Sequence, residues 1–159
     1  MFKKSMLIAV FFLIFTTALV QAGEEQNKQW VSQFYTQVLN TGNINLIDSL
    51  VAEDYQDHEP LPGYESNRDG LKSFFKMMRK AFPDLHNNVE YMVAEGDKVV
   101  SYITMTGTHK GDYMGAAGNG KSFTINVIDI IKVVNGKMTE HWGVGDYMTM
   151  MGQLASDTE

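Results

Sequence analysis

Cysteine is absent from the 159 residues of the chain, and only three prolines occur. The missing cysteines exclude disulfides, thiolate metal ligands and a cysteine nucleophile, so the folded state must rest on its apolar core. No internal repeat, low-complexity stretch or proline-rich linker divides the chain. The length therefore indicates a single domain built around one core.

Basic residues are also few: 13 Lys and Arg stand against 19 Asp and Glu, for a net charge of −6. No cluster of basic residues reverses this balance locally. A surface of this sign repels nucleic acid and anionic lipid. We therefore expect no nucleic-acid partner and no attachment to a membrane surface.

One long apolar run is present at residues 6–15, and Lys3 and Lys4 precede it. Small residues follow it up to Ala22, which is the pattern of a secretory signal peptide. The alternative is an N-terminal membrane anchor, but a spanning helix needs about 20 apolar residues. We predict a leader at 1–22, a single domain at 23–159 and an exported protein, periplasmic or secreted.

The apolar spacing changes along the chain from helical to alternating. A period near 3.6 predicts helices over 24–40, 44–51 and 69–82, and an extended piece with a turn lies at 55–63. Alternation then predicts strands over 89–93, 99–110, 121–134 and 137–146, followed by a short helix over 147–154. This order indicates an α+β fold with helices on one face of a curved antiparallel sheet, which leaves a cavity suited to a small molecule.

The last predicted strand places Asp146 on the same face as Trp142 and Val144, and His141 on the opposite face. A carboxylate among apolar neighbours has a raised pKa, which suits proton transfer near neutral pH. The alternative is that Asp146 ends the strand and caps a turn or helix. His141, by the same alternation, is expected to be structural.

Several short motifs together resemble a known family. They are Tyr55-Gln56-Asp57-His58, Phe82-Pro83-Asp84, Gly107-Thr108-His109-Lys110-Gly111, Asn135-Gly136-Lys137 and Glu140-His141-Trp142-Gly143-Val144-Gly145-Asp146. Over residues 26–154 the chain resembles the SnoaL-like polyketide cyclases, or ester cyclases, of the nuclear-transport-factor-2-like superfamily.

The resemblance implies a cone-shaped, cystatin-like α+β barrel that is commonly dimeric and binds a hydrophobic ketone. It also implies an aldol-type ring closure driven by a pocket aspartate, without metal or cofactor. Asp146 is the position that matches this aspartate, and His58 and His109 occupy the motifs of the family's pocket histidines. In the loop after Gly111, Ala117-Gly118 replaces the common proline pair.

Other residues have two interpretations each. Asp129 interrupts an apolar strand and is either a second pocket acid or a buried hydrogen-bond anchor. His58 could instead lie in a surface turn and His109 at a strand end. Four aromatic residues either line the cavity with Asp129 or belong to the plain core: Tyr35, Tyr102, Phe123 and Trp142.

Two classes of function remain open. The first is an exported enzyme that performs cofactor-free proton chemistry on a small hydrophobic carbonyl compound, and the second is an exported binding protein with the same cavity. No metal-ligand spacing, phosphate loop or nucleophile elbow is present. Outward-facing apolar residues on the predicted sheet (Val100, Tyr102, Ile128 and Ile130) predict a homodimer.

Overall fold

The computed structural model describes residues 21–155. The predicted leader therefore lies outside the described residues, apart from Gln21 and Ala22, which begin a helical stretch. Within the described range, no helix combines the length and apolar character needed to cross a membrane.

The first predicted helix is confirmed, but it changes geometry before it ends. Residues 21–34 are α-helical, and the π-helix η1 continues over Tyr35–Leu39. The Asn40 N–H closes η1 on the Tyr35 carbonyl at 2.8 Å, and Gly42 follows with a φ of 74°. Single π turns inside helices are common at functional sites. Two short helices come next, η2 (Ile44–Leu46) and α2 (Ile47–Leu50).

Helix α3 (Arg68–Ala81) begins one residue earlier than the sequence indicates. The Asn67 side chain accepts hydrogen bonds from the N–H groups of Asp69 and Gly70, at 3.0 and 2.9 Å. This is an N-cap, which satisfies two of the amides that have no partner inside the helix. Leu71 and Met78 are buried on one side of the helix.

Five strands form one sheet in the order β1-β5-β4-β3-β2. Their bounds are β1 (Val51–Asp57), β2 (His86–Glu95), β3 (Lys98–Thr108), β4 (Ser122–Val134) and β5 (Lys137–Gly145). Four strands form the predicted antiparallel meander. The expectation of a purely antiparallel sheet was wrong, because the segment before the first proline adds β1 parallel to β5. The sheet is therefore mixed.

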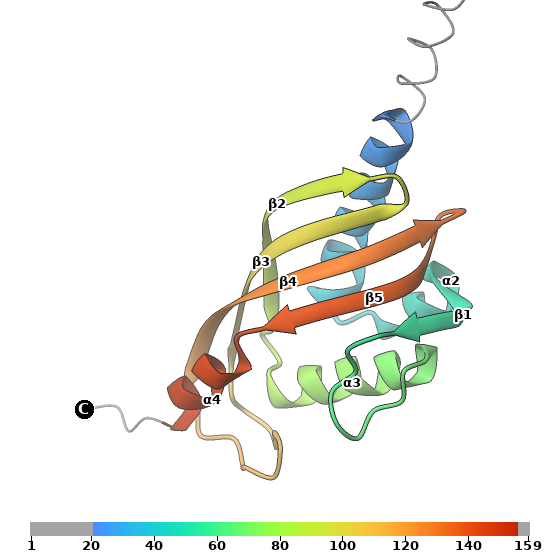
Figure 1. Ribbon diagram of the computed structural model, residues 1–159. Helices are drawn as coiled ribbons and strands as arrows, with labels where there is room; N and C mark the ends of the chain where they lie inside the picture. Colours follow the sequence, from blue (N-terminus) through green and yellow to red (C-terminus); the bar gives the residue numbers. More distant parts are fainter. Residues whose placement is uncertain (1–20, 156–159) are drawn as a thin grey trace, which may run out of the picture.

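The concave face of the sheet carries the core. Alternate residues of β3 are buried as predicted, and they form one cluster with side chains from the first helical stretch and α3. Figure 1 shows these helices beside the curved sheet, with β1 at its edge and α4 (Tyr147–Ala155) at the end of β5. The fold is α+β, as predicted, and the helices enclose a space against the sheet.

Candidate active site

A cavity of about 370 Å³ lies between the sheet and the helices. Much of its wall is apolar and comes from the first helix, α3 and β3, namely Phe34, Leu71, Phe74, Phe75, Met78 and Met105. Exposed residues of the segment between β1 and α3, among them Glu59 and Glu65, also line it. A mostly apolar enclosure with a few polar groups is typical of small-molecule sites.

Three of the polar groups form a hydrogen-bonded row, which we call the carboxylate–imidazole triad: Asp57, His141 and Asp129. His141 Nδ1 lies 3.1 Å from Asp57 Oδ1, and His141 Nε2 lies 3.4 Å from Asp129 Oδ1. The three side chains are 12–19% exposed. Asp57 and His141 are paired across β1 and β5, so the parallel β1–β5 ladder positions this half of the triad.

Tyr35 fixes the other end of the triad. Its hydroxyl donates a hydrogen bond to Asp129 Oδ2 at 2.6 Å. Tyr35 is the first residue of the π-helix η1, which places it opposite β4. Burial, together with the charge of Asp129, holds the pKa of Tyr35 well above its ordinary value. Tyr35 therefore stays protonated and acts as a hydrogen-bond donor.

The charges of the triad follow from its burial and pairing. Burial alone would lower the pKa of His141, but its hydrogen bonds to Asp129 and Asp57 raise it to about 10. Burial raises the pKa of Asp57, but the hydrogen bond from His141 lowers it. The net effect is a pKa below the ordinary value of the carboxyl. At neutral pH His141 is therefore an imidazolium that donates to a carboxylate on each side.

Gly143 leaves room for this arrangement on β5. A Cβ at this position would lie 2.8 Å from His141 Cε1 and 2.9 Å from Asp129 Oδ1. Any side chain would push one of the two groups away. The side of β5 that faces the cavity is therefore the side on which His141 and Gly143 lie.

Tyr147, at the start of α4, adds a further hydroxyl to the cavity wall. Burial, followed by the charge of Asp129, raises the pKa of Tyr147 to about 12. Its phenol is therefore a neutral donor at physiological pH. At the triad, the cavity combines the phenols of Tyr35 and Tyr147, an imidazolium and two carboxylates, which is a set suited to moving a proton and stabilising an oxyanion.

Comparison with known proteins identifies the family. The model of the SnoaL-like polyketide cyclase family matches residues 29–154. The chain belongs to this family. Among its relatives is the nogalonic acid methyl ester cyclase of Streptomyces nogalater, which is 23% identical over 117 residues, 72% of this chain and 87% of the relative.

Several solved structures share the fold. IdmH of Streptomyces antibioticus, assigned as a polyketide cyclase, is 26% identical, with a TM-score of 0.73 over 82% of this chain and 99% of its own. An assigned polyketide cyclase of Bacillus cereus is 34% identical, with a TM-score of 0.68 over 79% and 77%. AclR of Streptomyces galilaeus, assigned as a hydroxylase, has a TM-score of 0.75 at 24% identity over 85% and 99%. Because AclR is only 24% identical to this chain, the similarity to AclR shows a shared fold alone.

Asp146 of this SnoaL-like domain lies outside the cavity wall, contrary to the expectation from the strand pattern. It is exposed, and its carboxylate accepts the Thr149 N–H at 3.1 Å at the start of α4. β5 ends at Gly145, so Asp146 no longer follows the strand alternation. The structure gives Asp146 the helix-capping role that was the alternative interpretation.

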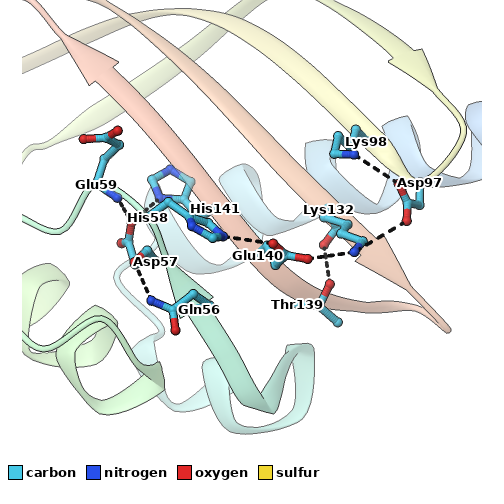
Figure 2. A network of polar contacts seen from close by, with 10 residues as sticks. All are labelled: Gln56, Asp57, His58, Glu59, Asp97, Lys98, Lys132, Thr139, Glu140 and His141. Carbon is cyan, nitrogen blue, oxygen red and sulfur yellow. Dashed lines mark hydrogen bonds and ion pairs between the residues drawn. The ribbon is translucent and has the colours of Figure 1, made fainter.

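His58 and Trp142 also lie away from the cavity, on the outer face of the β1–β5 ladder. Their rings stack at 4.3 Å, and His58 Nε2 lies 2.9 Å from Glu140 Oε2. Figure 2 shows His58 and Glu140 within a chain of polar contacts that reaches Lys132 and Asp97. The cavity face of β5 is the one that bears His141, opposite to the face expected to hold the site.

The remaining predicted residues lie in three places: the cavity wall, the buried core and the outer face of the sheet. Tyr35 and Asp129 line the cavity, and the carboxylate of Asp129 accepts the hydrogen bond of the Tyr35 hydroxyl there. His109 and Phe123 are buried beside Phe82, outside the cavity wall. Tyr102 lies on the outer face of the sheet and stacks on Tyr91.

Asp57, His141 and Tyr147 are among the cavity residues that were missed as site candidates from the sequence. The signal for His141 was present, since alternation groups it with Gly143 and Gly145, whose missing side chains leave space. Asp57 had no such signal, because β1 was not recognised as a strand. In the part of the chain covering residues 21–155, no group of three or more His, Asp or Glu side chains is arranged to hold a metal ion.

Proposed function

We propose that the protein is a cyclase or isomerase that transfers a proton on a small hydrophobic carbonyl compound, without a cofactor, and that Asp129 is its acid/base. The family supports the class of reaction. The observation that carries the assignment of Asp129 is the carboxylate–imidazole triad inside the cavity.

Asp129 accepts the proton of a C–H flanked by two carbonyls, which leaves an enolate. The phenol of Tyr147 is the donor available to the enolate oxygen, and the positive charge of His141 stabilises the enolate from beside Asp129. In a ring closure, the enolate carbon bonds to a second carbonyl carbon, and Asp129 returns its proton to the resulting alkoxide. The proton count is unchanged over the cycle, so no oxidant or metal enters the balance.

Asp57 and Tyr35 act as positioning residues in this scheme. Asp57 holds His141 through Nδ1, which leaves the Nε2–H directed to Asp129. Tyr35 donates to Asp129 Oδ2 and His141 Nε2 lies 3.4 Å from Oδ1, so the second lone pair of Oδ1 is the acceptor for exchange with a substrate. Both contacts are preformed, which reduces the reorganisation needed at the moment of reaction.

The second candidate is a non-catalytic binding protein that uses the same cavity. One observation favours it: Asp146, the position that matches the family's acid in the motif comparison, caps α4. The two candidates differ only in whether the cavity accelerates proton exchange.

The test is deuterium exchange, followed by NMR, at the acidic carbon of a panel of cyclic and linear β-ketoesters. We expect the protein to accelerate exchange, Asp129→Asn to abolish the acceleration and Asp146→Asn to retain it. Thermal unfolding of each variant confirms that the fold is kept. Equal rates with and without the native protein would favour the binding protein, and loss only in Asp146→Asn would refute the role of Asp129.

A further inference from the structure

The triad carries a net negative charge that no residue of its own compensates. Asp57 and Asp129 share the single positive charge of His141, whose two ring nitrogens both point at carboxylates. The hydroxyl of Tyr35 adds a hydrogen bond to Asp129 but no charge. One negative charge therefore remains in a mostly buried cluster.

The rest of the described cavity wall does not supply a compensating cation. Among the described residues that line it there is no Lys or Arg, whereas Glu59 and Glu65 add two further carboxylates at exposed positions. Lys132, one strand away from His141, lies on the other face of the ladder, where it pairs with Glu140 at 2.7 Å (Figure 2). Lys132 is therefore paired on the outer face of the sheet and does not line the cavity.

The aromatic part of the wall is suited to a cation as well. Tyr64 and Phe74 both line the cavity and meet edge to face, with ring centroids 5.7 Å apart. The face of an aromatic ring attracts an ammonium group, the more so when water is excluded. Charge and aromatic surface therefore favour the same kind of ligand.

We propose that the cavity takes a hydrophobic carbonyl compound that carries a protonated amine, and that it rejects the corresponding free carboxylic acid. The carbonyl reaches Asp129 and His141, and the ammonium compensates the negative charge among the carboxylates and aromatic rings. This names the substrate class of the site proposed above and rests on that cavity being the substrate site.

Three matched ligands test the proposal: 4-phenylbutan-2-one with an aminomethyl, a hydroxymethyl or a carboxylate group in the para position. Isothermal titration calorimetry at pH 7 gives the dissociation constant of each. We expect the amine to bind about tenfold more tightly than the alcohol, a difference of about 1.4 kcal/mol. The carboxylate is expected to bind more weakly than the alcohol by a similar factor.

Two variants of the cavity wall and one control variant show which carboxylates cause the preference for the amine. Asp129→Asn removes the uncompensated charge, so the preference for the amine over the alcohol should nearly vanish. The double variant Glu59→Gln, Glu65→Gln alters only exposed positions and should reduce the preference while leaving the fold intact. Asp146→Asn removes an exposed carboxylate outside the wall and should leave the order unchanged.

Equal binding of the amine and the alcohol, or tighter binding of the carboxylate, would overturn the proposal. A preference for the amine that persists undiminished in both cavity variants would overturn it too. Because only binding is measured, the outcome is separate from catalysis. Deuterium exchange that fails while the amine still binds best would refute the proposed enzyme and leave the ligand class standing.

Discussion

The ring of His58 lies parallel to that of Trp142, with 4.3 Å between the centroids and an angle of 2° between the planes. Each residue is the direct neighbour of a triad member, since Asp57 precedes His58 and His141 precedes Trp142. The His58 N–H donates to the His141 carbonyl at 2.9 Å. The outer stack and the inner Asp57–His141 pair therefore hold the same short stretch of the β1–β5 ladder from opposite faces.

We predict from this relationship that His58→Ala lowers the rate of proton exchange, because the end of β1 is held less firmly and Asp57 moves relative to His141. His58→Phe keeps a ring that can stack on Trp142 and should retain most of the rate. The readout that separates positioning from loss of stability is the pKa of His141, followed by NMR of its Cε1–H. A His58→Ala variant with an unchanged His141 pKa would contradict the coupling.

The pH dependence of stability should report the charge of His141. Its pKa in the folded state is about 10, against an ordinary value of 6.5, so the folded state binds the proton more tightly. This stabilisation is fully present below pH 6.5 and is lost as the pH rises toward 10. The free energy of unfolding should fall in this interval, by at most about 1.4 kcal/mol per pH unit for one proton.

Urea titrations at pH 6, 7, 8 and 9 measure this slope. Asp57→Asn removes one of the two carboxylates that raise the pKa of His141, so the slope should become smaller. Asp146→Asn, which alters an exposed cap, should not affect it. A stability that is flat from pH 6 to 9 in the native protein would show that His141 is not an imidazolium in the folded state.

Gly143 offers a test of the triad that leaves its chemical groups in place. Ala at this position puts a methyl group 2.8–2.9 Å from His141 and Asp129, so one of them must move. We predict that Gly143→Ala lowers the rate of exchange at least tenfold while the protein remains folded. The control is Gly152→Ala in α4, where nothing lies within 4 Å of the added methyl group and an alanine favours the helix. Equal activity of the two variants would argue against a tightly packed triad.

Local patterns in the sequence were sufficient for most of the fold. The alternation in β3 and the Asn135-Gly136 turn are purely local signals, and both are confirmed. β1 was not predicted as a strand, because its hydrogen-bond partner β5 lies about 85 residues further along the chain. Long-range parallel pairing leaves no periodic signal in so short a segment.

The site was harder to predict than the fold for the same reason. Asp129 was recognisable as a carboxylate in an apolar strand, and Tyr35 as part of a helical face. Their contact spans 94 positions of sequence, which no local pattern reports. Asp146 was misplaced for two reasons: β5 ends at Gly145, and the face of β5 that bears Trp142 is the outer one. Which face of β5 meets the helices is set by the whole sheet and not by the residues of β5.

The leader predicted at residues 1–22 leads to a prediction about the mature protein. We propose that the chain is exported and cleaved after Ala22, which would leave 137 residues beginning with Gly23. Expression of the full chain in a bacterium, followed by mass spectrometry of the periplasmic fraction, measures both points. Replacing Lys3 and Lys4 by Glu should retain the uncleaved chain in the cell, because the charged start of a signal peptide is required. An uncleaved native chain in the membrane fraction would indicate an anchor instead.

The outer face of the sheet leads to the last prediction, a homodimer. Tyr91, Val93, Ile128 and Val144 are 62%, 58%, 47% and 72% exposed. They lie on β2, β4 and β5, with β3 between β2 and β4. A patch of apolar side chains on a single sheet face is covered most simply by the same face of a second copy. We predict that Ile128→Lys, near the middle of the patch, converts a dimer into a monomer in light scattering at micromolar concentration. Glu53→Lys, at an exposed position of β1 with the same kind of added charge, should remain dimeric. A monomeric native protein at this concentration would refute the dimer, and it would leave the cavity, which is formed within one chain, unaffected.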